Sequence, residues 1–222
     1  MSTRDAILER IRRACGAEGG DRASAVRERL KGTPSGVIPA RGQRTQAAKV
    51  KLFCQKAEEA AATVTRIKNS DAVPKTIAQL LRRHNLPARI RMGADKRLAT
   101  LPWSTQKALE VNPGASDGDD EAGVSHAFAG AAETGTLLLT SGPDNPTTIN
   151  FLPDHHVVVV NAADIEGDYE TVFAMLRKAY GKGAMPRTVN FITGPSRSAD
   201  IEQTLILGAH GPRALHIIVV GG

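Results

Sequence analysis

The sequence predicts an α/β protein, with a mostly parallel β-sheet that is covered by helices on both faces. Two observations carry this prediction. Continuous apolar runs of strand length, with 157–160 the clearest, indicate strands that are buried on both sides. These runs alternate along the chain with segments whose apolar residues recur at helical spacing. The 222 residues, 41% of them hydrophobic, are enough for one full-sized domain and an additional arm.

The first part of the chain predicts an N-terminal helical arm. Ile7 and Ile11 are spaced for one face of a helix, and a second short helix follows after a glycine-rich break. A segment rich in proline and glycine at 32–42 then separates this arm from the main body. We therefore expect the arm and its connector at 1–40 and an α/β domain at 41–222.

The first half of that domain predicts two helices between short strands. The segment 44–62 is rich in alanine, lysine, glutamate and glutamine, which favour a helix. In 72–84 the apolar residues Ile77 and Leu80 follow helical spacing, and Pro74 falls in the first turn, where proline is tolerated. Strands are expected at 64–67, 90–92 and 108–111, and an acidic loop at 112–121.

The second half of the domain predicts more strands than helices. Residues 123–132 are small and alternately apolar, as in a strand. One helix is expected at 169–180, where Val172, Phe173 and Leu176 lie on one face. Further strands are expected at 136–140, 157–160, 189–192 and 217–220.

The net charge of +6 conceals an uneven distribution of charge along the chain. Residues 1–110 carry 23 Lys and Arg against 10 Asp and Glu, whereas 111–222 carry 6 against 13. The basic half has almost no aromatic residues that would stack on bases, so we expect no nucleic-acid binding. It would instead dock on acidic partner proteins, meet the acidic half of another copy in a homo-oligomer, or hold a small anionic ligand.

Composition also argues against a membrane span and an internal iron–sulfur cluster. No apolar stretch approaches the roughly 20 residues needed to cross a bilayer, and the N-terminus lacks the apolar core of a signal peptide. We therefore expect a cytoplasmic protein. The two cysteines, Cys15 and Cys54, form no C-x-x-C motif, so we expect no iron–sulfur cluster in this chain.

Four short polar motifs stand out in the C-terminal part, each at the edge of an apolar run. They are E-T-G-T at 133–136, N-F-L-P at 150–153, G-P-S-R-S-A-D-I-E at 194–202 and G-A-H-G-P at 208–212. In open α/β sheets, ligands bind outside the carboxyl ends of the strands. We therefore expect these motifs to lie at the carboxyl ends and to form a site.

The motif at 194–202 predicts a turn that binds an anion. Gly194 lets the backbone approach a ligand, and Ser198 would cap a helix whose first N–H groups, with Arg197, hold a carboxylate or phosphate. The alternative is a tight, well-capped turn without a ligand, since caps and anion sites share one geometry. The expected ligand-binding residues are Thr134, Gly135, Gly194, Pro195, Ser196, Arg197 and Asp200.

Glu133 and His210 are the candidate catalytic residues. Glu133 lies among alanine and glycine residues, where a solubilising charge is not expected, and it would act as a general base or nucleophile. The alternative is a structural carboxylate that caps a neighbouring helix. His210 lies in a loop flanked by glycines, where an imidazole suits a functional role.

The other histidines predict no metal site. No cluster of histidine, cysteine and carboxylate residues has the spacing of metal ligands, and no Walker or G-x-G-x-x-G motif is present. His155 and His156 open a strand, so that one should face in and one out, and either fits a packed histidine. His84 and His216 are interpreted as structural.

Taken together, the motifs resemble the LUD domain, the lactate utilization protein C family. The family pattern is E-T-G-T, then L-P before a strand, then G-P-S-R-[ST]-A-D-I-E and G-x-H-G-P, and the four elements occur here in the same order. The third is long and specific, and the motif-bearing part covers 123–222. The resemblance implies a Rossmann-like three-layer α/β/α fold, similar to the NagB/RpiA/CoA-transferase superfamily and to 5-formyltetrahydrofolate cyclo-ligase.

The resemblance also implies a role in a three-protein system that oxidises L-lactate to pyruvate, in which the other two components are iron–sulfur subunits. Glu133 or His210 would then be the base, Arg197 would hold the carboxylate, and the redox cofactor is unknown. The alternatives are a non-catalytic assembly or ligand-sensing protein and, by fold analogy, a transferase or ligase acting on CoA-like or folate-like substrates.

Overall fold

A computed structural model describes most of the chain, and it divides into two compact units, Met1–Val37 and Ile38–Gly222. The division falls inside the proline- and glycine-rich connector. In the first unit, the helices α1 (Thr3–Ala14) and α2 (Arg22–Gly32) bury none of their described residues. No helix in the described part of the chain is both long and apolar enough to cross a membrane. The described residues are 3–15, 22–32, 36–181, 183–198 and 206–221.

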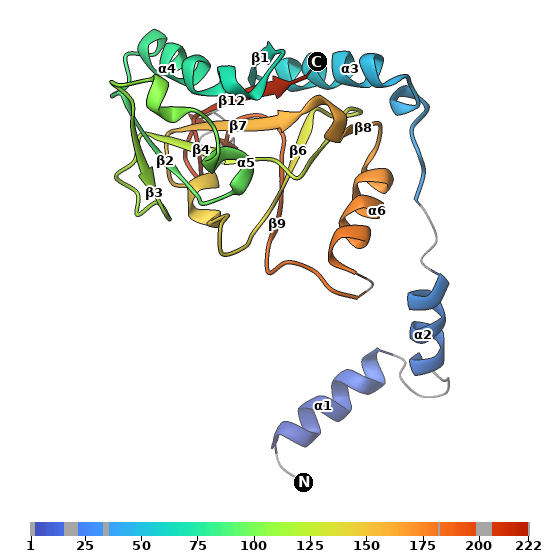
Figure 1. Cartoon of the computed structure of the whole chain (residues 1–222). Helices are drawn as coiled ribbons and strands as arrows, with labels where there is room; N and C mark the ends of the chain where they lie inside the picture. The colour runs from blue at the N-terminus through green and yellow to red at the C-terminus, as the bar shows by residue number, and fades with distance from the viewer. Residues whose placement is uncertain (1–2, 16–21, 33–35, 182, 199–205, 222) are drawn as a thin grey trace. The chain divides into compact units, whose positions relative to one another are not determined.

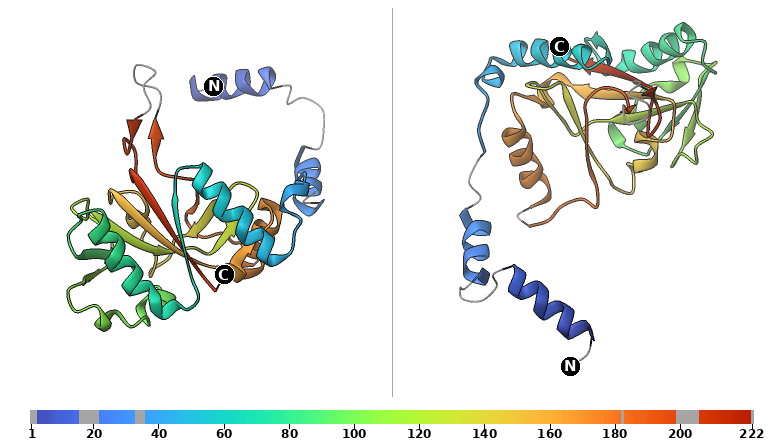
Figure 2. Two further views of the ribbon diagram at one scale, coloured as in Figure 1. Left: turned by 90° about the horizontal axis from the view of Figure 1, so that it is seen from above. Right: turned by 180° about the vertical axis from the view of Figure 1, so that it is seen from behind.

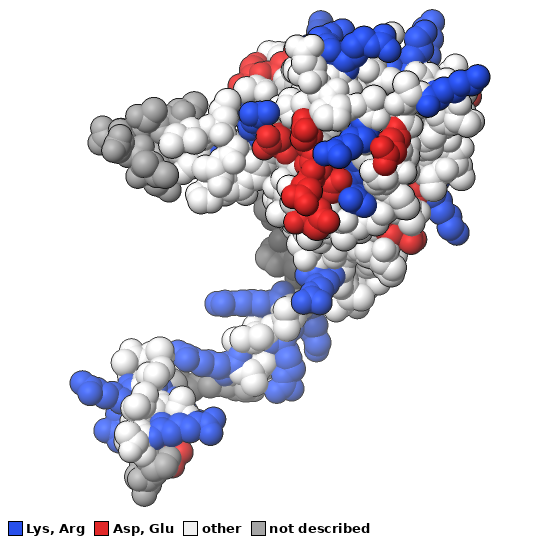
Figure 3. All heavy atoms as spheres, turned by 90° about the vertical axis from the view of Figure 1, so that its left-hand side faces the viewer, with Lys and Arg blue, Asp and Glu red and all other residues white. Residues whose placement is uncertain are grey.

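The first unit is also basic. Its described residues include eight Lys or Arg against three Asp or Glu, and Figure 3 shows the basic side chains in blue. On the face of the larger unit shown in Figure 3, side chains of both signs are mixed. The ion pairs of the larger unit include that between Arg91 Nε and Asp120 Oδ2 at 2.8 Å.

The larger unit is built around a six-stranded sheet (Figure 1). Its strand order is β1-β12-β7-β4-β2-β3, and every neighbouring pair is parallel. Every residue of β7 except its last is buried, because other elements cover the sheet on both faces. The bounds are β1 (Thr63–Ile67), β2 (Arg89–Met92), β3 (Glu110–Pro113), β4 (Ala122–His126), β7 (His155–Asn161) and β12 (Ala214–Val220).

Side-chain alternation along β7 builds two cores, one on each face of this sheet. On one face, residues such as Val157 pack with α4 (Val73–Arg83) and with Leu98 of the short helix α5 (Lys96–Ala99). On the other, residues such as Val158 pack with α3 (Gln46–Glu59). The left view of Figure 2 shows β12 running between α3 and α4. The predicted α/β fold, a parallel sheet between helices, is confirmed.

A second, four-stranded sheet was not predicted. Its order is β8-β5-β6-β9, and β6 runs antiparallel to both β5 and β9. Leu137 of β6 packs in the core beneath α3, while Leu138 faces α6. The tight turn between β5 and β6 makes these two strands an antiparallel hairpin, while β5 pairs in parallel with β8 on its other side. The bounds are β5 (Ala129–Ala131), β6 (Thr136–Thr140), β8 (Ile165–Glu166), β9 (Val189–Ile192) and α6 (Tyr169–Tyr180).

Short elements complete the described chain. Two-residue strands, β10 (Arg197–Ser198) and β11 (Ile206–Leu207), pair antiparallel. The 3-10 helices are η1 (Ala40–Gly42), η2 (Ser70–Ala72), η3 (Trp103–Thr105), η4 (Thr147–Asn150) and η5 (Ala162–Asp164).

Candidate functional site

Two of the polar motifs are joined to each other by backbone hydrogen bonds. The Ser196 N–H donates to the Pro212 carbonyl at 2.8 Å, and the Ser196 carbonyl accepts from the Gly208 N–H at 3.0 Å. The pairing of β10 with β11 continues this contact. The turn after β9 and the loop that carries His210 therefore form one structural unit.

A cavity of about 280 Å³ lies against this unit. Its lining includes five of the predicted site residues, and Asn150 and Phe151 of the N-F-L-P motif line it as well. The volume is close to the lower end of the range of about 300–1,000 Å³ for ligand pockets, which suits a small ligand. The predicted residues that line it are Gly194, Pro195, Ser196, Arg197 and His210.

The cavity lies at the amino ends of the central strands. His156 and Leu215, the second residues of β7 and β12, line it. Gly194 does follow the carboxyl end of a strand, but this strand is β9 of the second sheet. The prediction that all motifs lie at carboxyl ends of one sheet is therefore wrong, because the His210 loop precedes β12 and a local pattern does not reveal which sheet a strand joins.

The turn after β9 is fixed against the end of α3. Gly194 has φ 71°, and a Cβ at this position would collide with the carbonyl oxygen of Ala60. The Arg197 guanidinium donates a hydrogen bond to the same carbonyl. Arg197 is exposed. Since a guanidinium has five N–H groups, Arg197 keeps donors for a ligand in the cavity.

Ser198 lies in β10 and pairs with Ile206. The helix that was expected to follow this serine falls on residues outside the described part of the chain. Asp200 lies outside the described residues. Among the described residues, Arg197 is therefore the feature of this motif that suits an anion.

Glu133 belongs to the turn between β5 and β6, and its side chain contacts the first residue of α6. It is not among the residues that line the cavity. Its side chain is buried, and Oε1 accepts a hydrogen bond from the Tyr169 N–H at 3.0 Å. Oε2 lies 3.9 Å from Arg41 Nη2. A carboxylate at the N-terminus of a helix satisfies a free N–H and complements the helix dipole. This is the geometry of the capping alternative.

A cluster of four hydroxyls links the E-T-G-T motif to the cavity. The Thr136 hydroxyl lies 2.7 Å from that of Thr134, 2.7 Å from that of Tyr169 and 2.6 Å from that of Thr193. Thr134 also donates to Tyr169 at 2.9 Å, and Thr193 lines the cavity. Gly135, with φ 69°, packs directly on the backbone of α3. Thr134 and Gly135 thus support the site from outside the lining.

His156 is a lining residue that sequence reasoning did not single out. Its ring is 1% exposed, and Nε2 lies 3.0 Å from Ser125 Oγ, which in turn donates to Asn150 Oδ1 at 2.8 Å. Because the serine gives its one hydrogen to Asn150, Nε2 must carry the hydrogen of the imidazole. Nδ1 is then an acceptor, and it has no partner among the described residues.

The electrostatics of His156 keep the ring neutral. Burial, followed by the nearby His216, lowers the pKa of His156 to about 3. Near pH 7 the ring therefore acts as a hydrogen-bond acceptor through Nδ1 and carries no charge. The adjacent pair His155-His156 at a strand start was the available signal, since alternation places one of the two on each face.

Comparisons with known proteins identify relatives over part of the chain. Over 107 residues the chain is 39% identical to lactate utilization protein C of Geobacillus thermodenitrificans, covering 47% of this chain and 45% of that protein. Over 100 residues it is 38% identical to an uncharacterized protein of Neisseria meningitidis serogroup B, covering 45% of this chain and 42% of that protein. The chain thus matches less than half of the length of these relatives.

Structure and family comparisons extend over more of the chain. A crystal structure of a DUF162 family protein from Deinococcus radiodurans superposes with a TM-score of 0.57, over 80% of this chain and 99% of that chain. At 22% identity this likeness concerns the fold, and it supports the Rossmann-like α/β architecture. The model of the LUD domain matches residues 50–220, which include the whole cavity lining, and the chain therefore belongs to the LUD domain family.

Proposed function

We propose that this chain binds a small 2-hydroxycarboxylate, with L-lactate as the first candidate, and works in a lactate utilization system. The observation that carries the proposal is the meeting of three polar motifs around one small cavity that has a cation and a neutral acceptor in its lining. The names of the lactate utilization relatives support the choice of lactate.

Each of three side chains has a separate task in this proposal. The planar guanidinium of Arg197 matches a carboxylate, to which it donates paired N–H bonds. His156 Nδ1 accepts the hydrogen bond of the ligand hydroxyl, which pyruvate lacks. During oxidation this hydroxyl hydrogen turns from His156 to His210, which is exposed at the cavity and takes up the proton as the base. Glu133 is a weaker candidate for the base, because its carboxylate caps α6.

The electrons released by oxidation of the ligand need an acceptor outside the cavity. Oxidation of L-lactate to pyruvate releases two electrons and two protons, and an electron acceptor must take the electrons. The chain has two cysteines, fewer than the four thiolates that a typical cluster uses. We therefore assign the electrons to iron–sulfur subunits that work with this chain, as part of the same cytoplasmic system.

Binding of the ligand to the purified chain tests the proposal. Isothermal titration should give tighter binding for L-lactate than for pyruvate, and Arg197→Ala should weaken lactate binding by about 100-fold, because a charged hydrogen-bonded pair is lost. The matched control is Arg177→Ala, which removes an exposed arginine in the last turn of α6. This variant should bind L-lactate as the wild type does.

Other outcomes would contradict the proposal. Equal loss in both arginine variants would show a nonspecific charge effect. Binding of CoA or a folate in place of lactate would favour the transferase or ligase alternative. Binding of no ligand, together with capture of iron–sulfur subunits, would favour the assembly role.

A further inference from the structure

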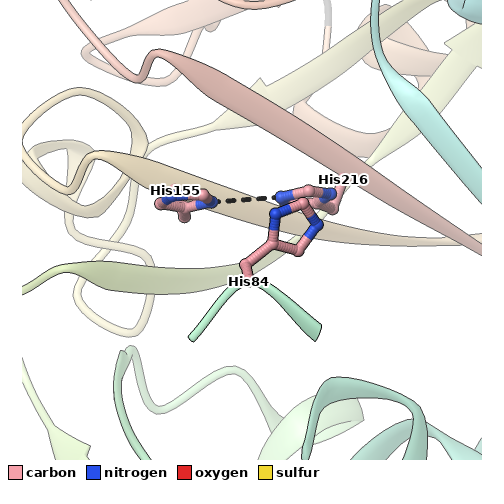
Figure 4. Close-up of side chains that lie close together, drawn as sticks. All are labelled: His84, His155 and His216. Atoms are coloured by element: carbon pink, nitrogen blue, oxygen red, sulfur yellow. Dashed lines mark hydrogen bonds between the residues drawn. The ribbon is translucent and has the colours of Figure 1, made fainter. Parts of the chain in front are cut away.

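Three histidines from distant parts of the chain meet at the amino edge of the central sheet (Figure 4). His84 is the C-cap of α4, His155 is the first residue of β7, and His216 is the third residue of β12. One ring nitrogen from each lies within 4.8 Å of the others. We call these residues the histidine triad.

The parallel register explains why two of these rings share a face. Ala214 is opposite His155, and His216 is opposite Val157, so the two histidines are diagonal neighbours on the same face. This is the α4 face, which is opposite the face of His156. The two ring planes are 4° from parallel, and the His84 ring lies over them with its centroid 4.8 Å from that of His216.

The spacing of the nitrogens suits a tetrahedral metal ion. Imidazole nitrogens bind Zn²⁺ at about 2.0–2.1 Å, so two ligands of a tetrahedral site are about 3.4 Å apart. His155 Nδ1 and His216 Nε2 are already 3.2 Å apart. Because the three nitrogens lie within 4.8 Å of one another, His84 would have to approach by at most about 1.4 Å to reach this spacing. Its side chain is exposed at a helix end, so a small rotation of the ring suffices.

A hydrogen bond holds one of these rings in the orientation of a ligand. Thr63 Oγ1 lies 2.5 Å from Nδ1 of the buried His216, on the side of the ring away from His155. Histidines that bind metals nearly always use their other ring nitrogen in such a bond, which fixes the ring and leaves one nitrogen for the ion. Nε2 of His216 is the nitrogen left.

We propose that the histidine triad is a binding site for a divalent late transition-metal ion, best fitted by Zn²⁺. Three imidazoles without a thiolate favour zinc, copper or nickel over magnesium or calcium, which prefer oxygen ligands. The three protein ligands leave a fourth coordination position for water or another ligand. The site is separate from the lactate cavity and does not depend on the proposed function.

Metal titration of the full chain without an affinity tag tests this proposal. In competition with a chromophoric chelator, the wild type should bind one Zn²⁺ per chain, and Co²⁺ should give the visible absorption of a tetrahedral ion. His84→Ala should weaken Zn²⁺ binding by at least about 100-fold, and Thr63→Val by about 10–100-fold, which is the usual effect of a lost partner behind a ligand.

Two controls separate the triad from other ligands. His210→Ala removes an exposed histidine outside the triad, and Cys15→Ser with Cys54→Ser removes both thiols; each should bind Zn²⁺ as the wild type does. Unchanged binding in His84→Ala, or less than half an ion per wild-type chain at saturation, would overturn the proposal. Circular dichroism checks that His84→Ala is folded, which its exposed position at a helix end favours.

Discussion

His155 and His156 are neighbours on β7, yet they belong to two different regions of the molecule. His156 faces the side of α3 and the second sheet, where the polar motifs surround a cavity. His155 faces the side of α4, where it meets two other imidazoles. Because successive side chains of a strand point to opposite faces, these two adjacent histidines lie in different surroundings on the two sides of the sheet. The two regions share one interaction, because His216 of the triad contributes to the lowered pKa of His156.

The largest difference between His155 and His156 is expected in how each makes the free energy of unfolding depend on pH. The pKa of His156 is lowered by burial to about 3, below the roughly 6.5 of an unfolded chain, so the unfolded state takes up the proton first. Stability should fall as the pH drops from 6.5 to 3, by up to roughly 4 kcal/mol from this residue. Urea denaturation of His156→Gln between these pH values, with EDTA present, should show a clearly flatter profile.

His155→Gln is the matched variant for this experiment. The pKa of His155 is also lowered, by burial and then by His84, but its ring lies at the open edge of the sheet. Because His155 is 7% exposed, against 1% for His156, we expect its substitution to flatten the profile less. If His155→Gln flattened the profile as much as His156→Gln, the two faces would not differ in the way described.

Replacement of Gly135 by alanine should destabilise the face of the sheet that carries the cavity. With φ 69° and the backbone of α3 directly against it, Gly135→Ala forces both strain and a collision. We expect a loss of about 3 kcal/mol in the free energy of unfolding. Gly114→Ala, also at positive φ but with open space around it, should cost about 1 kcal/mol. Equal losses in urea denaturation would show that backbone strain alone matters.

Glu133→Gln distinguishes capping from catalysis. Because Glu133 accepts the Tyr169 N–H at the start of α6, the loss of its charge should cost about 1 kcal/mol of stability. Lactate binding and turnover with partner proteins should stay within about twofold, since 1.4 kcal/mol corresponds to tenfold and no ligand contact is lost. A loss of turnover by more than 100-fold in a stably folded variant would instead make Glu133 the catalytic base.

Ser125→Ala should give the smallest effect, confined to the cavity face. The substitution removes the acceptor of His156 Nε2–H and the donor to Asn150, at a cost of about 1 kcal/mol. Without this bond the ring is no longer held in one tautomer, so the preference for L-lactate over pyruvate should shrink. Zn²⁺ binding by the histidine triad should be unchanged. A loss of Zn²⁺ binding would mean that the two faces are coupled.

Sequence patterns predicted those features that depend on short stretches of chain. The helix at 169–180 and the strand runs at 64–67 and 157–160 were recognisable because burial on defined faces dictates their periodicity. The motifs at 194–202 and 208–212 were predicted to form a site because glycine, proline and arginine follow an apolar strand run there. The structure brings the described residues of both together at the cavity.

Features that depend on long-range pairing were not predictable in this way. The second sheet forms because β9 pairs with β6, and no local pattern specifies that partner. The histidine triad joins residues 71 and 61 positions apart, so it has none of the close spacing by which metal motifs are recognised. The tautomer of His156 follows from the single hydroxyl hydrogen of Ser125, and this contact can be seen only in the folded structure.

The four-hydroxyl cluster allows Thr193 in the cavity wall to act either as a hydrogen-bond acceptor or as a donor toward the cavity. Thr134 donates to Tyr169, and when Tyr169 in turn donates to Thr136, the one hydrogen of Thr136 is left for either Thr134 or Thr193. If it closes the ring on Thr134, Thr193 donates inward and shows the cavity only lone pairs. If it donates to Thr193, the Thr193 hydrogen turns outward. A carboxylate bound in the cavity, as proposed, would select the second arrangement, and the wall would then adjust to the anion by rotation of two hydroxyl hydrogens.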